Sequence, residues 1–543
     1  MTIISYLIFY NLTFLYGRSF LIFFSRLFRK NIKDIKIADI KIVSLSPLIF
    51  LFILGNLSFI FNFIFPIKYF IYIISPIIFL NLLNKDFSNL NQNKLINFIL
   101  IPIFVAISSS DVGLHFDSGL YHLNFQNWLR ESNLVLGLSN IYAPYGWSSI
   151  NEYFSSIFWF NNNFIFLHFI NLIFVTQFFS FLFNNLFSKK LVFKYSSFFI
   201  LIYGIIDNFG FNGGRNGFLS IQSIGKFDTS FAILYFIFSL IILNQLIEKK
   251  FLSTDMVFIS FFLLFCIQMK LTGLVCGVLY LLYFYKYKIT NKISYLKIIK
   301  LNIYPIIISF LWLLKNMLQT GCLFFGFEFT CFNNLRWYEK GYASSLMLDT
   351  QTFNQAYSFG LNIFDWIDNW YSKDANKTFI LNFFLSISIL IIGKYIFYKL
   401  KSYEKDVFIF YCFFILLSLI IWVGGAPDPR FAYGLFLLFV SLLSADVYSE
   451  KDFINKILNK NVFLYTVFFI CLALTPRLNS YKTGLASVDV FRTVSIPNVE
   501  YKISDYWGEI PVEEECWVNL NCNKANKNLK KNKLLIFSIF EQK

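Results

Sequence analysis

Long apolar runs dominate this chain and limit the folds open to it. Several of them, such as residues 163–187, 229–247 and 407–424, approach the roughly 20 residues that a helix needs to cross a bilayer. Of the 543 residues, 57% are hydrophobic and only 14% are charged. A soluble core cannot bury so much apolar surface, so the sequence predicts an all-α polytopic membrane protein.

About fourteen apolar segments are candidate spans, and several of them are shorter than a simple spanning helix. We therefore expect a bundle of about 11–14 transmembrane helices. The candidate spans are residues 3–25, 42–64, 66–84, 96–107, 163–187, 195–206, 229–247, 255–269, 272–285, 301–318, 377–399, 407–424, 431–447 and 461–475.

The basic residues indicate the orientation of the chain. The net charge is +16, and Lys and Arg gather in short loops between apolar runs, beginning with residues 26–41. Such loops stay on the cytoplasmic side. The opposite side then receives three outer loops, residues 108–152, 207–228 and 319–376, and the turn 424–430. Nearly all the other polar chemistry falls in these segments, so we look for a functional site there.

We expect two structural parts. Residues 1–475 form a transmembrane domain, and residues 476–543 form a small, loop-rich cap on the outer side. The first apolar run ends in basic residues and has no small-residue cleavage site, so it is predicted to be a span and not a signal peptide. No basic stripe alternates with stacking aromatic residues, which excludes nucleic acid as a partner.

The first outer loop contains DVGLHFDSGLYHLNFQNWLRE, residues 111–131, around which we expect the site to form. Its apolar residues Tyr121, Phe125, Trp128 and Leu129 recur with helical, one-sided spacing. This spacing predicts a helix that lies along the membrane surface.

Two carboxylates of this stretch, Asp117 and Asp111, are candidate catalytic residues. An acid held at the outer end of a span can act as a general base. The structural alternative is that Asp117 or Ser118 caps the following helix. His122 is expected to orient substrate or to have a structural role. A divalent-metal site made of His115, Asp117 and His122 lacks helical i, i+4 spacing, so no metal is expected.

Cations and further acids in other outer segments are candidate phosphate-binding residues. Arg215, Lys226 and Asp228 belong to the turn-rich second outer loop, and Asp228 would otherwise cap the next span. Lys270 and Lys315 lie near the outer ends of spans. A lysine there either neutralises a lipid phosphate or extends to the interface without a function.

The turn GGAPDPRFAYG sets Asp428 between two prolines and beside Arg430. A rigid corner that holds a guanidinium at the interface suits a phosphate or diphosphate clamp, and a local Asp-Arg pair is the alternative. A carboxylate and several cations around one cavity would allow chemistry on a lipid-linked phosphate. The acid would deprotonate an acceptor hydroxyl while the cations stabilise the departing phosphate.

Four cysteines form two close pairs in the outer segments. Cys322 and Cys331 share the third outer loop, and Cys516 and Cys522 share the tail. Paired cysteines on an oxidising face favour two local disulfides over four free thiols. A zinc site is less favoured, because the pairs lack CxxC spacing and have no histidine nearby.

Several of these motifs resemble one known family. FDSGLYHLNFQNWL, followed by VLGLSNIYAPYGWSSINEYF, resembles the first periplasmic loop of GT-C-type (family 39-like) integral membrane glycosyltransferases, in particular bacterial members with a D-x-G-L-Y-H-L pattern. WLLKNMLQTGCLFF resembles their W..(R/K)N....G motif, which adds Asn316 to the candidates, and PDPRFAYGLF resembles their DPR(F/Y) turn. The tail around Cys516 and Cys522 is similar to theirs.

The resemblance implies a GT-C-like helix bundle with a polyprenyl-phosphate sugar donor and inversion at the anomeric carbon. It also implies a catalytic acid in the first outer loop, a role that we assign to Asp117, with Asp111 as second choice. The enzyme would lie in a bacterial inner membrane, with its active face in the periplasm. It would transfer the sugar to an envelope glycan or lipid without a cofactor.

Two other classes of function stay open at this point. A transporter or polymerase of lipid-linked polysaccharide would need ionisable groups in the middle of its spans, but this chain keeps most of them near one face. An inactive GT-C-like scaffold would bind an envelope partner and no lipid phosphate.

Overall fold

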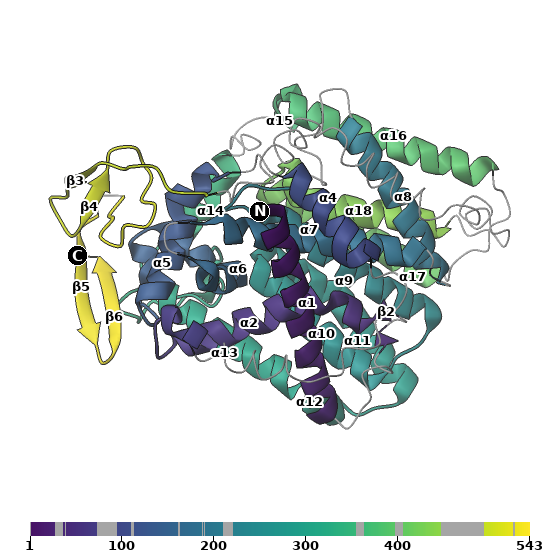
Figure 1. Ribbon diagram of the computed structural model, residues 1–543, viewed down its shortest axis with the longest axis horizontal. Coiled ribbons are helices and arrows are strands. Elements are labelled where there is room, and N and C mark those ends of the chain that lie inside the picture. Colours follow the sequence, from purple (N-terminus) through teal and green to yellow (C-terminus); the bar gives the residue numbers. More distant parts are fainter. Residues whose placement is uncertain are drawn as a thin grey trace.

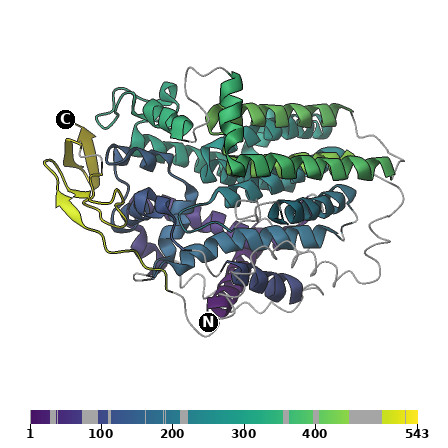
Figure 2. The ribbon, with the colours of Figure 1, turned by 90° about the horizontal axis from the view of Figure 1, so that it is seen from above.

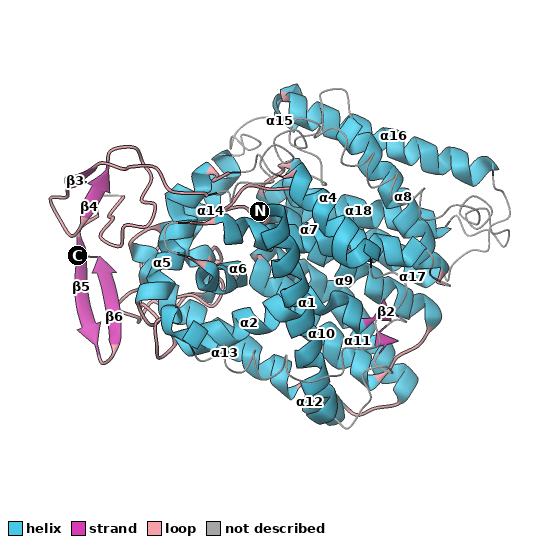
Figure 3. Cartoon of the chain, viewed as in Figure 1, coloured by secondary structure: helices cyan, strands magenta, loops and turns pink. Residues whose placement is uncertain are grey.

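The computed structural model is mainly helical, and two strand pairs of the tail lie at one end of the helices (Figures 1 and 3). The structure describes residues 2–27, 36–37, 40–72, 95–109, 113–160, 163–186, 188, 190–209, 221–353, 363–396, 405–446, 493–524 and 527–542.

Four helices of the described ranges are long and apolar enough to cross a membrane. Protein encloses almost all of α7 (Ile165–Leu186) and α9 (Asp228–Glu248), so these two helices lie inside the bundle. By contrast, α13 (Ile303–Thr320) and α17 (Lys405–Gly425) leave most of their apolar surface exposed. Exposed apolar helices of this length are typical of a membrane protein.

Most of the other long helices follow the apolar runs of the sequence, with bounds that differ from the expected ones by a few residues. Two of the expected spans, residues 461–475 and most of 66–84, lie outside the described residues. The remaining α-helices are α1 (Thr2–Leu27), α2 (Ser46–Asn62), α4 (Ile101–Ser108), α5 (Leu123–Glu131), α6 (Ile150–Ser155), α8 (Leu191–Phe209), α10 (Ser253–Met269), α11 (Cys276–Asn291), α12 (Tyr295–Leu301), α14 (Tyr342–Phe353), α15 (Ile363–Ser372), α16 (Asp374–Ile396) and α18 (Pro429–Asp446). Of these, α5, α6, α12, α14 and α15 form in segments that were predicted to connect the spans.

Buried polar side chains join the helices of the core. The hydroxyls of Tyr6 on α1 and Thr176 on α7 are 2.6 Å apart. Asn56 on α2 and Gln268 on α10 exchange two hydrogen bonds, of 2.9 and 3.2 Å. Such bonds fix how neighbouring helices align, because an unpaired polar group is costly in apolar surroundings.

The tail forms two antiparallel hairpins at the end of the bundle that carries α5 and α14 (Figures 1 and 2). Strand β3 (Tyr501–Ile503) pairs with β4 (Glu509–Pro511), and β5 (Leu529–Leu534) pairs with β6 (Phe537–Gln542). A short pair near the other end joins β1 (Lys36–Ile37) to β2 (Ile40–Lys41).

The tail also covers α5. Asn124 Nδ2 donates to the Asn519 carbonyl at 2.6 Å, and Asn127 Nδ2 donates to the Val518 carbonyl at 2.7 Å. Asn124 is fully buried, and so is its neighbour Gln126.

The apolar residues of α5, Phe125, Trp128 and Leu129, are buried in the core of the protein. The expectation that this helix lies along the membrane surface is therefore wrong, because protein and not lipid covers its apolar face.

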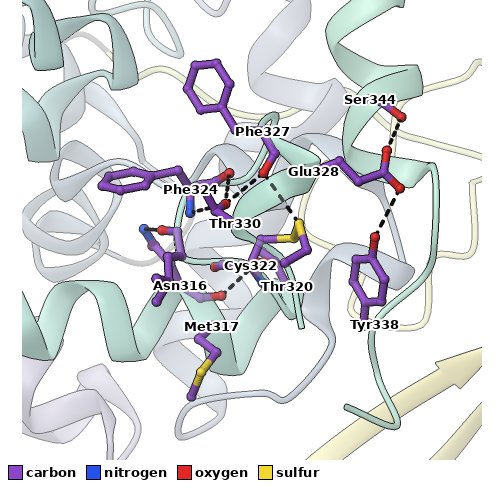
Figure 4. The surroundings of a disulfide bond; sticks show 12 residues. Asn316, Met317, Thr320, Cys322, Phe324, Phe327, Glu328, Thr330, Tyr338 and Ser344 are labelled. Atoms are coloured by element: carbon purple, nitrogen blue, oxygen red, sulfur yellow. Dashed lines mark hydrogen bonds between the residues drawn. A yellow bond between two sulfur atoms is a disulfide. The ribbon is translucent and has the colours of Figure 1, made fainter. Parts of the chain in front are cut away.

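Disulfides close both outer cysteine loops. Cys322 is bonded to Cys331, and Cys516 to Cys522, which are the two pairs that the sequence favours. In the first of these loops the Glu328 carboxylate accepts hydrogen bonds from the hydroxyls of Ser344 (2.6 Å) and Tyr338 (3.1 Å) (Figure 4). The disulfide thus closes the loop after α13, and the hydrogen bond between Glu328 and Ser344 holds this loop to α14.

Candidate functional site

The first and second outer loops meet through their backbones. The His115 amide donates to the Ile224 carbonyl at 3.0 Å, and the Ile224 amide donates to the Gly113 carbonyl at 3.1 Å. The hydroxyl of Ser118 also donates to the Ile224 carbonyl. Gly225 has a positive φ of 90°, and a Cβ there would lie 2.3 Å from Ser118 Oγ. Glycine is required at this contact for both reasons.

Asp117 stands at the start of a π-helical turn, Ser118–His122, that leads into α5. Its side chain makes no capping hydrogen bond, so the structural alternative for this residue is not formed. Its Oδ2 atom lies 3.4 Å from His115 Nδ1. Burial raises the pKa of Asp117, but the hydrogen bond and charge of His115, helped by His122 and Lys226, outweigh burial and hold this pKa below its ordinary value.

A chain of ion pairs links the ends of three other helices. Asp228, the first residue of α9, accepts a 2.6 Å hydrogen bond from Nζ of Lys270, which follows α10. The second carboxylate oxygen of Asp228 lies 4.0 Å from Nε of Arg430, at the start of α18. Arg430 Nε is also 3.2 Å from Asp428. The local Asp-Arg pair therefore forms, and Asp228 joins it to Lys270.

Asp117 and these ion pairs belong to one electrostatic cluster. Burial and the charge of Arg430 lower the pKa of Lys226, while the charges of Asp117 and Asp228 oppose that change. The charge of Asp117 also acts on Arg430. We define the outer charge cluster as six residues from four segments of the chain: Asp117, Lys226, Asp228, Lys270, Asp428 and Arg430.

A buried acid that the sequence analysis missed supports His122. Glu152 on α6 contacts His122 Nδ1 with one carboxylate oxygen and accepts a 2.6 Å hydrogen bond from Gln126 with the other. Both partners of the His-Glu pair are buried. The signal in the sequence was a glutamate just after the start of α6, three residues beyond its Ser149 cap.

The tail reaches the same region. The Trp517 amide donates to the Gly119 carbonyl at 2.8 Å, and the Trp517 ring packs where a Cβ on residue 119 would be. Lys524 Nζ lies 3.5 Å from the hydroxyl of Tyr142, whose pKa is raised to about 12 by burial and then by the charges of Asp117 and Glu514. The tail thus forms one wall beside the π-helical turn.

Other sequence candidates lie elsewhere. Lys315 is fully buried, donates to Ser148 Oγ and stacks 3.5 Å from the Trp312 ring, so it is enclosed within the protein and takes no part in the cluster's ion pairs. Asn316 donates to the Leu323 carbonyl at 3.0 Å and supports the loop after α13. Two further candidates, Asp111 and Arg215, lie outside the described residues.

A metal site is not formed by the described residues. They contain no group of three or more His, Cys, Asp or Glu side chains placed to hold an ion. The cluster can instead offer a carboxylate base and cations for an anionic group.

Comparison with known proteins gives one match. A family model described as a domain of unknown function (DUF8201) matches residues 1–437. No curated protein and no solved structure matches the chain.

Proposed function

The chain belongs to the DUF8201 family, and we propose that it is a GT-C-type membrane glycosyltransferase. It moves a sugar from a polyprenyl-phosphate donor to an envelope glycan or lipid acceptor. With this function we propose a GT-C-like bundle of about 11–14 transmembrane helices in a bacterial inner membrane. Its outer charge cluster would face the periplasm.

One observation carries the proposal. A carboxylate held ionised, Asp117, lies within electrostatic reach of two cations from separate segments, Lys226 and Arg430. Asp228 joins Arg430 to a third cation, Lys270. An otherwise apolar chain gains little net stability from assembling mostly buried charges, since the cost of removing them from water offsets much of their attraction. Binding of a ligand that has one anionic and one nucleophilic centre would explain why the chain brings these charges together.

The reaction follows from the roles of these groups. Asp117 accepts the proton of an acceptor hydroxyl, and the hydroxyl oxygen attacks the anomeric carbon of the sugar. The bond from that carbon to the phosphate oxygen breaks, and its electron pair stays on the polyprenyl phosphate. Lys226 and Arg430 stabilise the growing phosphate charge, and Lys270 orients Asp228 beside them. Attack from the side opposite the phosphate inverts the anomeric carbon.

Sugar transfer by the full chain in nanodiscs tests this proposal. Undecaprenyl-phosphate carrying different hexoses and pentoses serves as donor, and release of undecaprenyl phosphate is measured. Asp117→Asn is expected to lower the rate about 10²–10⁴-fold, the usual contribution of general base catalysis. Glu131→Gln is the control, because Glu131 only pairs with Lys68 at the surface. Full transfer by Asp117→Asn would exclude the proposed base.

The same assay distinguishes the proposed transferase from the two alternative functions. A transporter or polymerase of lipid-linked polysaccharide would move or join donors without the single-sugar transfer, and an inactive scaffold would release no phosphate at all.

A further inference from the structure

The turn of the β5–β6 hairpin has an unusual composition. Leu534 pairs with Phe537, so the turn consists of Leu535 and Ile536 alone. Two-residue turns in hairpins select Asn-Gly or similar pairs, because their backbone needs a positive φ. Leu535 adopts a φ of 55°, which is sterically unfavourable for a branched side chain. The backbone geometry of the turn therefore does not explain why a leucine stands at position 535.

The side chains of this turn do not contribute to the core. Leu535 is 90% exposed and Ile536 is 60% exposed, and the preceding Leu534 is also exposed. These three residues, which form the apolar tip of the hairpin, do not lower the strain of the turn backbone, and they do not pack against the protein. They therefore point to a contact outside the chain.

The hairpin lies level with the end of a candidate membrane span. Leu136 pairs with Ile539 of β6, and the next residue, Gly137, donates to the carbonyl of Leu318 in the last turn of α13. Because α13 is mostly exposed and apolar, lipid would surround it up to that turn. The hairpin tip is therefore close to the level at which headgroups begin.

A second set of hydrogen bonds also places the hairpin tip beside the end of an apolar helix. Asn133 Nδ2 donates to the Ile536 carbonyl at 2.9 Å, and the Leu134 amide donates to the carbonyl of Asn62, the last residue of apolar helix α2. Just beyond Asn62, Ile64 and Phe65 are more than half exposed. The tip and this corner thus form one apolar rim beside the outer ends of two apolar helices.

The positive charges next to the tip indicate what the tip contacts. Lys530 and Lys533 are exposed on β5, within a few residues of Leu535. An apolar tip flanked by lysines matches the boundary between acyl chains and anionic headgroups, where the apolar residues enter and the cations pair with phosphate. A protein partner would not need the tip to lie at the level of the lipid.

We propose that the tip of the β5–β6 hairpin, Leu534 to Ile536, inserts into the outer surface of the membrane that holds the helices, with Lys530 and Lys533 on anionic lipid headgroups. This contact anchors the tail to the bilayer. The inference does not depend on the glycosyltransferase proposal.

Fluorescence quenching of the full chain in nanodiscs tests it. Leu535→Cys in a Cys412→Ser, Cys471→Ser background receives an environment-sensitive dye, since the other free cysteines of the described residues, Cys266 and Cys276, are buried. The same dye on Ile503→Cys is the matched control, because Ile503 is 91% exposed on the other hairpin. Iodide probes exposure to water, and lipids with a spin label high on the acyl chain probe insertion.

The dye at residue 535 is expected to be quenched by the labelled lipid and shielded from iodide, whereas the dye at 503 shows the reverse. Lys530→Gln with Lys533→Gln is expected to lower occupancy of the inserted position by roughly fivefold per lysine in phosphatidylglycerol nanodiscs at low salt, and to change little in phosphatidylcholine. Iodide quenching at 535 equal to that at 503 overturns the proposal. Shielding from both quenchers also overturns it, because a protein would then cover the tip.

Discussion

Gly119 and Trp517 are in direct contact although almost 400 residues separate them in the sequence. The Trp517 amide donates to the Gly119 carbonyl at 2.8 Å, and the nearest ring atom lies 2.6 Å from the position of a Cβ on residue 119. The π-helical turn after Asp117 and the disulfide-closed loop of the tail therefore form one packed unit. Changes in the tail are expected to affect the site for this reason.

Substitution of Gly119 tests this contact. Gly119→Ala forces the Trp517 ring to move, and overpacking of this kind costs about 1–3 kcal/mol. We expect a lower unfolding temperature and faster proteolysis of the tail. Gly113→Ala in the same loop is the control, because its Cβ would meet no atom within 4 Å. Equal behaviour of the two variants would show that the tail does not pack on the turn.

The Glu152-His122 pair is expected to stabilise the site strongly. Glu152→Gln removes the charge that holds His122 Nδ1 and weakens the bond from Gln126, so we expect a loss of about 1–3 kcal/mol in unfolding free energy. Glu131→Gln breaks an ion pair that is about one-third exposed and should cost less than about 1 kcal/mol. Chemical denaturation of both variants in the same detergent measures the difference. A smaller loss for Glu152→Gln than for Glu131→Gln would contradict the structure.

The pH dependence of sugar transfer is expected to shift when His115 is changed. Because the pKa of Asp117 is lowered, its carboxylate stays ionised to a lower pH than that of a free aspartate. The stability that it contributes is present above its unfolded pKa and is lost as the pH falls through the folded pKa. His115→Gln removes the main interaction that opposes burial, so the pKa of Asp117 rises.

We therefore expect the acidic limb of the pH profile of kcat/KM to move to higher pH in His115→Gln. The rate at neutral pH should change much less than the rate in the acidic range. An acidic limb at the same pH as in the wild type would show that His115 does not act on Asp117.

Much of the helical architecture was predictable from the sequence. Apolar runs such as 163–187 and 229–247 became α7 and α9, since hydrophobic length alone decides which segments can be spanning helices. The sequence predicted that Asp228, Lys270 and Arg430 share one side of the helices, and ion pairs join them at helix ends. The two cysteine pairs followed from their short separations.

The rest depends on contacts between residues that are distant in sequence. The sequence placed Lys315 near the end of a candidate span, but did not reveal that Ser148 and Trp312 would enclose it. It placed Glu152 in an outer loop without revealing that His122 would be its partner. Likewise, the one-sided apolar spacing of α5 suggested a helix along the membrane surface, because the sequence did not reveal that the protein core would bury its apolar side and that a tail almost 400 residues away would cover it.

Binding of a lipid phosphate tests the central claim most directly. Native mass spectrometry of the full chain compares undecaprenyl phosphate with undecaprenol, which lacks the phosphate. The wild type should bind the phosphate selectively, and Lys226→Gln should weaken that binding at least about tenfold, as expected for loss of one charge-assisted contact. Lys68→Gln, on the surface pair with Glu131, should bind like the wild type. Equal binding of the two lipids, or full binding by Lys226→Gln, would contradict the assignment of the outer charge cluster to a phosphate.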